Sequence, residues 1–137
     1  GGFYGSTNIP SEFICILYKL LIIKPPSTVI DAMISNKKYR YTKVIGLFYK
    51  RITSDSLVIY QQLEKHLSDY RRIRMKDSQG NISITYIDEV TDMLLNEDFL
   101  YVINLPRITS RLHLEEKNLI SERVILLDKS IKKDNKV

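Results

Sequence analysis

Two histidines and one cysteine are the side chains in this sequence best suited to acid–base, nucleophilic or metal chemistry, and their spacing supports none of it. His66 and His113 are far apart along the chain, and neither has a Glu or a second His at the spacing of a metal site. His66 falls on the outward side of its predicted helix, which indicates a solvated side chain. Cys15 lies within the apolar run 13–23, where a buried, inert thiol is expected. We therefore predict that the chain is not an enzyme, and we expect no metal and no cofactor.

Two motifs that resemble phosphate-binding or catalytic elements have simpler structural explanations. The glycine-rich segment 1–6 lacks the Lys-Ser/Thr pair of a phosphate loop and follows no predicted strand, so a tight turn is favoured. The sequence Ser54-Asp55-Ser56 is typical of a helix cap. The single cysteine excludes an intrachain disulfide, as is typical of a reduced intracellular compartment.

Charge is sharply sorted along the chain. Residues 37–76 carry eleven Lys or Arg against three Asp or Glu, a net of +8, whereas residues 77–116 carry two against eight, a net of −6. The whole chain has a formal net charge of +5. A basic half beside an acidic half indicates a surface that meets other macromolecules, rather than a pocket built around one small substrate.

The acidic half contains a candidate protein-docking surface. Its members are five carboxylates and one leucine within or just after a predicted helix: Asp88, Glu89, Asp92, Leu95, Glu97 and Asp98. The helix dipole alone explains the first three carboxylates, but not Glu97 and Asp98, which follow the helix. Leu95 falls on the same outer side as Asp92, so we expect an exposed leucine ringed by carboxylates. Such a surface would suit a basic amphipathic segment of a partner.

The basic half contains a candidate contact for RNA or for an acidic partner, formed by Lys43, Lys50, Arg51, Arg71, Arg72 and Arg74. Tyrosines interleave with these cations, as in surfaces that combine base stacking with phosphate contacts. Against this, Tyr41 and Tyr70 fall on predicted core faces, and the cations alone are typical of a solvated helix face. The sequence has no RNA-binding strand motif of the RRM kind and no KH loop. A direct RNA-binding module using residues 37–76 therefore stays as the alternative.

The elements that position these residues predict a mainly α fold: a compact multi-helix domain with one short β-hairpin at about 73–86. Helical periodicity and capping residues predict helices over 12–23, 28–34, 39–52, 55–72 and 88–96, a short helix after Pro106, and a last segment over about 118–129. The run 13–23 is too short to span a membrane and is expected to be buried. Residues 1–130 are expected to form one domain with an irregular lead-in at 1–10, followed by a polar tail at 131–137.

The helix at 39–52 shows the clearest periodicity. Tyr41, Val44, Ile45, Phe48 and Ile52 form one apolar stripe at helical spacing and predict a buried face. Lys43 and Lys50 fall opposite that stripe, together with a glycine in mid-helix. A mid-helix glycine costs about 1 kcal/mol relative to alanine, so Gly46 is expected to allow another backbone to come close.

Several segments resemble the pre-mRNA-splicing factor 38 family. They are the glycine motif Gly1-Gly2-Phe3-Tyr4-Gly5, the run 13–17, the helix 41–53 ending in Tyr-x-Arg-Ile-Thr, the segments 60–63 and 69–74 with Asp-Tyr-Arg-Arg-Ile, and the pieces 87–89, 94–95 and 105–107. Together they extend from Gly1 to about Leu127 without large gaps.

The resemblance implies an almost all-helical, non-enzymatic domain that serves as a protein-binding platform in the spliceosome. Members of the family are nuclear and are needed for spliceosome activation after the tri-snRNP has joined. Their partners include microfibrillar-associated protein 1 and a matrin-type zinc-finger splicing protein. The resemblance also implies that a helical stretch preceding the glycine motif lies outside this sequence, as does an Arg/Ser-rich tail.

Overall fold

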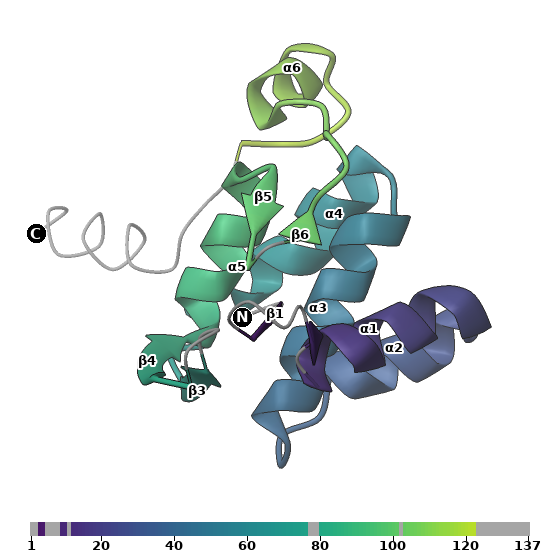
Figure 1. The fold of residues 1–137 in the computed structure, drawn as a ribbon. Helices are drawn as coiled ribbons and strands as arrows, with labels where there is room; N and C mark the ends of the chain where they lie inside the picture. Colours follow the sequence, from purple (N-terminus) through teal and green to yellow (C-terminus); the bar gives the residue numbers. More distant parts are fainter. Residues whose placement is uncertain (1–2, 5–8, 11, 77–79, 102, 123–137) are drawn as a thin grey trace, which may run out of the picture. The chain divides into compact units, whose positions relative to one another are not determined.

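The computed structural model describes residues 3–4, 9–10, 12–76, 80–101 and 103–122 (Figure 1). The chain divides into two compact units, residues 1–107 and residues 108–137. Each unit is described by itself.

The mainly α fold class is confirmed. The first unit contains the helices α1 (Glu12–Ile23), α2 (Ser27–Ile34), α3 (Arg40–Thr53), α4 (Ser56–Leu63), the 3-10 helix η2 (Glu64–Ser68) and α5 (Ile87–Asn96). The second unit contains α6 (Arg111–Glu116), whose N-cap Ser110 accepts a hydrogen bond from the amide of His113. None of the helices in the described ranges is both long and apolar enough to cross a membrane.

The predicted hairpin is confirmed as the antiparallel pair β3 (Arg72–Lys76) and β4 (Ile82–Tyr86). Two further antiparallel pairs of two residues each, absent from the sequence prediction, also form in the first unit. They are β1 (Phe3–Tyr4) with β2 (Ile9–Pro10), and β5 (Phe99–Leu100) with β6 (Ile103–Asn104).

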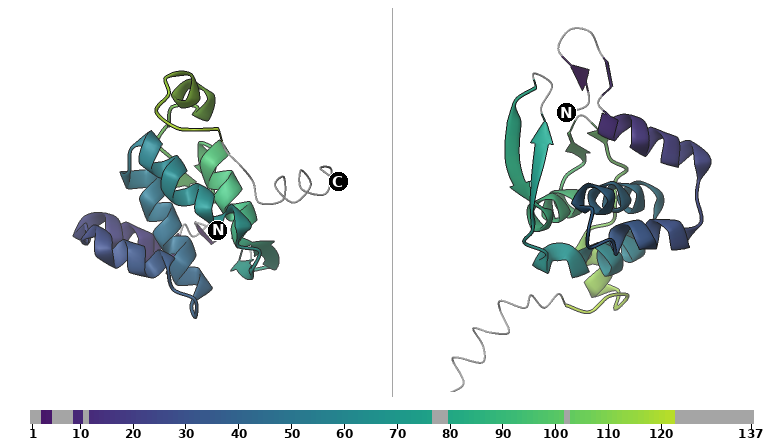
Figure 2. Two further views of the ribbon diagram at one scale, coloured as in Figure 1. Left: turned by 180° about the vertical axis from the view of Figure 1, so that it is seen from behind. Right: turned by 90° about the horizontal axis from the view of Figure 1, so that it is seen from below.

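The core of the first unit is built around α3. In the views of Figures 1 and 2, α1 and α2 lie on one side of α3 while α5 and the hairpin lie on the other. Val44, Leu47 and Phe48 are completely buried. The ring of Phe48 packs edge-on against Phe13 from α1, with the ring centres 5.1 Å apart. The predicted stripe is therefore correct at its centre, whereas Tyr41 at its start is 48% exposed.

Gly46 lies where α2 comes close to α3, and the predicted close approach of another backbone is confirmed. A Cβ atom placed on Gly46 would lie 2.7 Å from Cγ1 of Ile34, and 3.4 Å from both the amide nitrogen of Ile34 and Cβ of Met33. The two helices could not pack this closely if position 46 carried a side chain.

We expect Gly46→Ala to lower the free energy of unfolding by about 1–3 kcal/mol, because the added methyl group must push α2 away. Helix propensity alone would have the opposite effect and stabilise the variant by about 1 kcal/mol. A urea melt measures the change in the free energy of unfolding, and its sign decides between steric crowding and helix propensity. A variant more stable than the wild type would contradict the close approach.

The predicted helix over 55–72 is wrong beyond Leu63. The chain tightens into η2, and Asp69 then turns it, since its Oδ1 accepts a hydrogen bond from the amide of Arg71 at 3.2 Å. An Asp side chain that bonds the amide two residues later replaces the helical bond and allows β3 to start at Arg72. Tyr70, predicted to be in the core, is 62% exposed as a result.

Other helix boundaries differ in smaller ways. The helix α2 is preceded by Pro26 with no side-chain cap, and α5 starts at Ile87, so Asp88 lies inside its first turn instead of capping it. Residues 118–122 form turns and irregular backbone, contrary to the predicted helix over 118–129, and the remainder of that helix lies outside the described residues.

Candidate interaction surfaces

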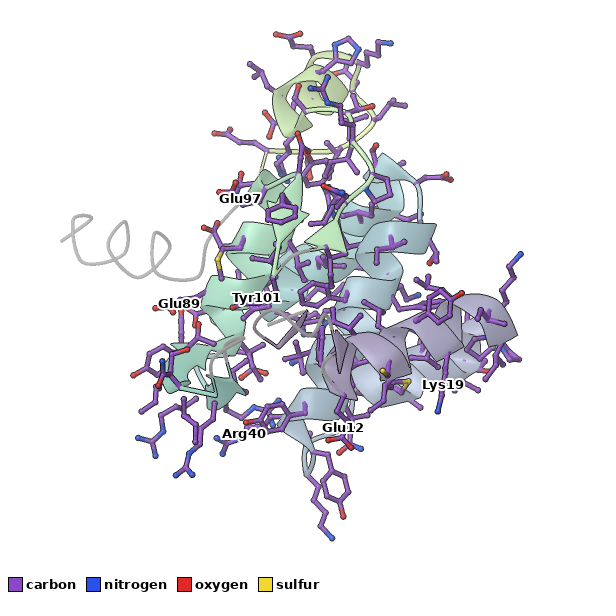
Figure 3. The ribbon with its side chains drawn as sticks, in the orientation of Figure 1. Glu12, Lys19, Arg40, Glu89, Glu97 and Tyr101 are labelled. Carbon is purple, nitrogen blue, oxygen red and sulfur yellow. The ribbon has the colours of Figure 1, made fainter. Side chains whose placement is uncertain are left out.

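The five carboxylates of the predicted docking site form what we call the acidic surface: Asp88, Glu89, Asp92, Glu97 and Asp98. All are exposed except Asp88, which is half-buried. Figure 3 shows Glu89 and Glu97 near the two ends of α5. Asp98 also lies 3.8 Å from Nε of Arg107, in a pair so exposed that it contributes little to stability.

The predicted exposure of Leu95 is wrong, because this side chain is only 6% exposed. The helix α5 packs against α3, α4 and η2 and therefore buries more than one narrow stripe. Phe99, which follows the acidic surface in β5, is 56% exposed and was missed. Its position directly after two carboxylates was the available signal.

Two of the six predicted basic contact residues are buried and cannot meet RNA. Lys43 is 6% exposed, and its Nζ lies 2.6 Å from Oδ2 of Asp69. Arg51 is 1% exposed. Helical spacing placed Lys43 opposite the apolar stripe, but α3 is packed on nearly all sides, so Lys43 and Arg51 are both buried with partners.

The guanidinium of Arg51 connects the C-terminal end of α5 to the following chain through hydrogen bonds. Its Nε donates to the carbonyl of Leu94 at 2.8 Å, Nη1 to that of Pro106 at 2.6 Å, and Nη2 to that of Glu97 at 3.4 Å. No basic residue lies in the last turn of α5, so Arg51 supplies the cation that a helix C-terminus favours. Burial lowers the pKa of Arg51 from its ordinary value, and the negative charge of Asp98 partly offsets this effect.

Among the residues that the structure describes, two of the other predicted cations have an acidic partner and two have none. Lys50 lies 2.8 Å from Asp31, and Arg71 bonds Asp69, whereas Arg72 and Arg74 are exposed on the hairpin. The basic half therefore presents fewer available cations than its sequence charge suggested. This weakens the RNA-binding alternative.

The outer face of the hairpin is partly apolar. Ile73 and its cross-strand partner Thr85 are buried, while Ile82, Ile84 and Tyr86 are 40–65% exposed. The strand is anchored to α3 by Tyr41, whose hydroxyl donates to the carbonyl of Arg74 at 2.5 Å and accepts from its amide at 3.0 Å.

The predicted burial of the helix at 12–23 is also wrong, since Leu17 is the one residue of α1 that is fully buried. Its exposed apolar side chains fall on one side of the helix and form what we call the α1 surface: Ile16, Tyr18, Ile22 and Ile23, at 39–69% exposure. Cys15 is exposed beside them, not buried. A helix in which almost every residue is apolar has no polar side to indicate which face is outward.

Asp69 is the centre of a charged cluster between α3 and the start of β3. Both of its oxygens accept hydrogen bonds from Arg71, at 2.9 Å from Nε and 2.7 Å from Nη2, and Oδ2 also accepts from Lys43. The bonds from Arg71, followed by that from Lys43, hold the pKa of Asp69 well below its usual range, although burial opposes this. The same pairing raises the pKa of Arg71, whose Nη1 also donates to the carbonyl of Lys37 at 3.0 Å.

His66 is half-buried beside this cluster, so the prediction of a solvated histidine is wrong. Burial, and next the positive charge of Lys43, lower the pKa of His66 to about 4. Asp69 acts in the opposite direction but does not compensate, since its charge is already shared by Lys43 and Arg71. The imidazole is therefore neutral at physiological pH.

We expect this histidine to make stability depend on pH. Between about pH 6.5 and 4 the unfolded chain binds a proton at His66 and the folded chain does not, so the free energy of unfolding falls as the pH is lowered. A loss of about 1–3 kcal/mol is expected across this range, and His66→Gln should remove it. His113→Gln, at an exposed position in α6, is the matched control. Equal pH slopes for wild type and His66→Gln would contradict the buried, neutral state.

Comparison with known proteins gives one consistent answer. The model of the PRP38 family matches residues 1–118. A pre-mRNA-splicing factor 38 of Schizosaccharomyces pombe is 42% identical over 88% of this chain and 56% of that protein. Its counterpart in Arabidopsis thaliana is 36% identical over 93% of this chain and 36% of that protein. This chain thus spans about a third to just over half the length of these relatives.

A solved structure with the same fold comes from the crystal structure of the Snu23–Prp38–MFAP1(217–258) complex of Chaetomium thermophilum. The match has a TM-score of 0.87 and a sequence identity of 31%, and it covers 98% of this chain and 72% of that chain.

Proposed function

The chain belongs to the PRP38 family, and from this membership we propose that it acts in pre-mRNA splicing as a non-enzymatic, protein-binding platform of the spliceosome. Proteins related to Snu23 and MFAP1, which accompany the related chain in its crystal structure, are the proposed partners. The proposal extends to the nucleus as its location and to spliceosome activation after the tri-snRNP has joined as its step.

The observation that carries this proposal is the α1 surface. Three of its four side chains, Tyr18, Ile22 and Ile23, are more than 60% exposed, and they lie on one side of a helix whose other side packs on α3. Apolar side chains grouped in this way are typical of a protein–protein contact, whereas single exposed ones need no explanation. A partner helix would bury them as the central part of an interface.

The acidic surface is the second proposed contact. Its five carboxylates would attract a basic segment, and Phe99 would provide the apolar anchor that Leu95 cannot provide. Exposed charges at the edge of an interface act mainly on the association rate and its salt dependence. The two surfaces therefore predict different effects when each is altered.

The test measures binding of the chain to purified proteins related to Snu23 and MFAP1 from the same organism. Ile22→Asp combined with Ile23→Asp changes exposed positions only, so the fold should persist, and affinity for at least one partner should fall more than tenfold. Glu89→Lys combined with Asp92→Lys should instead lower the association rate at low salt. Ile82→Asp, equally exposed on the hairpin, is the control.

Wild-type affinity of the folded Ile22/Ile23 variant for both proteins would remove the α1 surface as the contact. Failure of the wild-type chain to bind either protein would contradict the proposed function itself.

A further inference from the structure

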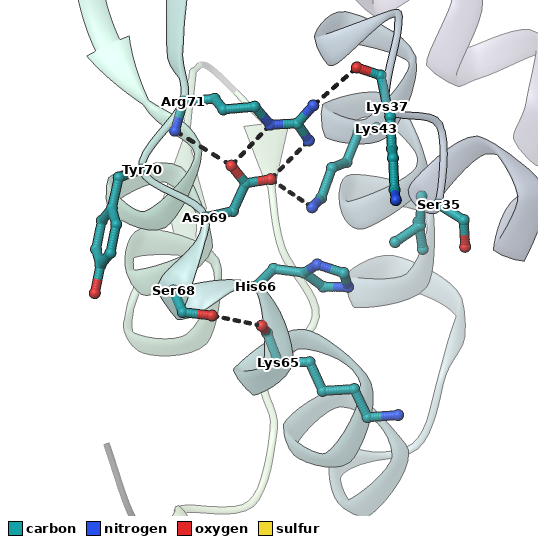
Figure 4. A pocket seen from close by; sticks show the side chains of 10 residues that line it. Ser35, Lys37, Lys43, Lys65, His66, Ser68, Asp69, Tyr70 and Arg71 are labelled. Carbon is teal, nitrogen blue, oxygen red and sulfur yellow. Dashed lines mark hydrogen bonds and ion pairs between the residues drawn. The ribbon is translucent and has the colours of Figure 1, made fainter. Parts of the chain in front are cut away.

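An open pocket of about 590 Å³ lies where the C-terminal end of α2, the helix α3 and η2 meet, and neither proposed contact surface includes it (Figure 4). Figure 4 shows the side chains of Lys37, Lys43 and His66 gathered around the same space, with Lys65 at its edge. Arg71 and Asp69 complete its charged lining.

The cations of this pocket outnumber its acids. Four lining side chains are Lys or Arg and one is a carboxylate, which leaves a formal net charge of +3 while His66 is neutral. Asp69 is fully engaged by Lys43 and Arg71. Neither Lys37 nor Lys65 has an acidic partner among the residues that the structure describes, so their charges face the pocket and its rim without compensation.

His66 lines the pocket together with these cations. Burial is the main cause of the lowered pKa of His66, and the positive charges of Lys43, Lys65 and Arg71 lower it further, against the opposing charge of Asp69. A neutral imidazole can donate one hydrogen bond, and a protonated one can donate two. An anion placed between these groups would offset their repulsion and favour the protonated form.

The structural role of the Asp69 cluster does not account for the whole lining. Asp69, Lys43 and Arg71 fix the turn that leads into β3 with the help of the backbone carbonyl of Lys37, but without the side chains of Lys37, Lys65 or His66. A bound metal cation is disfavoured by the net positive charge. An RNA backbone is better served by a row of cations along a groove than by a group that converges on one pocket.

We propose that this pocket binds a phosphate monoester, presented on a phosphorylated side chain of a protein partner. A monoester carries about −1.5 to −2 charges at pH 7 and has three acceptor oxygens, which matches the surplus of cations better than a singly charged carboxylate or phosphodiester. The proposal does not depend on the proposed role in splicing, because binding can be measured with the chain alone.

The two histidines allow a direct test by NMR. Inorganic phosphate and O-phosphoserine, added at constant ionic strength, should shift the imidazole signals of His66 along a saturable curve and raise its pKa by about one unit. His113, in the second unit and exposed, should not respond in this way. Absence of a saturable His66 shift, or equal shifts for both histidines, would overturn the proposal.

Variants of the unpaired lysines make the test specific. Lys37→Ala and Lys65→Ala should each weaken phosphate binding about tenfold without affecting the fold, because both side chains are exposed. Lys19→Ala, on the exposed side of α1, should have no effect (Figure 3). Unchanged binding by both pocket variants would overturn the site. Stronger binding of an oligouridylate than of O-phosphoserine at equal phosphate concentration would assign the pocket to RNA instead.

Discussion

Replacing Arg51 by alanine is expected to lower the free energy of unfolding by about 3–5 kcal/mol, among the largest effects of any single substitution in this chain. The variant would leave the carbonyls of Leu94, Glu97 and Pro106 without their donor. Leaving the buried carbonyl of Leu94 unpaired costs about 1–3 kcal/mol, the part-buried bonds to Glu97 and Pro106 contribute less, and the lost side chain also leaves a cavity.

Two neighbouring substitutions make the Arg51 experiment decisive. Arg51→Lys keeps the charge and most of the aliphatic chain but has a single nitrogen in place of the guanidinium group. It should therefore recover part of the lost stability. Lys50→Ala breaks a partly exposed ion pair with Asp31 and should cost no more than about 1 kcal/mol. Urea melts in which Arg51→Ala is as stable as Lys50→Ala would show that Arg51 does not hold the end of α5.

Replacing Asp69 by alanine is expected to cost a similar amount, about 3–5 kcal/mol, because it leaves the ammonium group of Lys43 buried without a partner. Asp69→Asn keeps an oxygen for the amide of Arg71 and should cost less. Since the folded-state pKa of Asp69 is lowered, its stabilising effect should be complete above about pH 4 and should be lost as the pH falls towards that folded-state pKa.

A double-mutant cycle separates the energy of the Lys43–Asp69 ion pair from the contribution of Asp69 to the turn. Lys43→Met removes the charge but keeps an apolar stem, so Asp69→Ala should cost less in that background, with a coupling of at least about 1 kcal/mol. Strictly additive effects would contradict a direct Lys43–Asp69 interaction. The prediction that Lys43 is a solvated surface cation is wrong, because its side chain is only 6% exposed.

The sequence predicted those features that depend on local rules. The boundaries of α1, from Glu12 to Ile23, follow from Pro25-Pro26 and the apolar run, and the hairpin follows from alternation around a glycine-containing loop. Gly46 was correctly interpreted as a point of close approach. Each of these needs information from only a few neighbouring residues.

Features that depend on tertiary partners were not predictable in this way. The burial of Lys43 and Arg51 depends on Asp69 and on carbonyls more than 40 residues from Arg51 in sequence. The spacing of Leu95 from Asp92 predicted that Leu95 faces solvent, but α5 contacts α3, α4 and η2 and buries more than one side. In the hairpin, alternation shows that two faces exist without showing which one meets the helices, and the structure buries Ile73 but exposes Ile82 and Ile84.

The family resemblance, in contrast, identified more than the local rules did. The segment Asp69-Tyr70-Arg71-Arg72-Ile73 belongs to that resemblance, and the structure shows that it forms the turn and the start of β3. The PRP38 family match over residues 1–118 confirms the resemblance.

The measurement that tests the central proposal most directly is the affinity of the wild-type chain for a protein related to MFAP1, compared with an RNA oligonucleotide, at 50 and 200 mM salt. A protein-binding platform anchored by the α1 surface should bind the protein at both concentrations, with a change of less than about tenfold, whereas RNA binding through several phosphates should fall by about 10³ or more. Tight RNA binding that persists at 200 mM salt, together with no binding of the protein, would contradict the account.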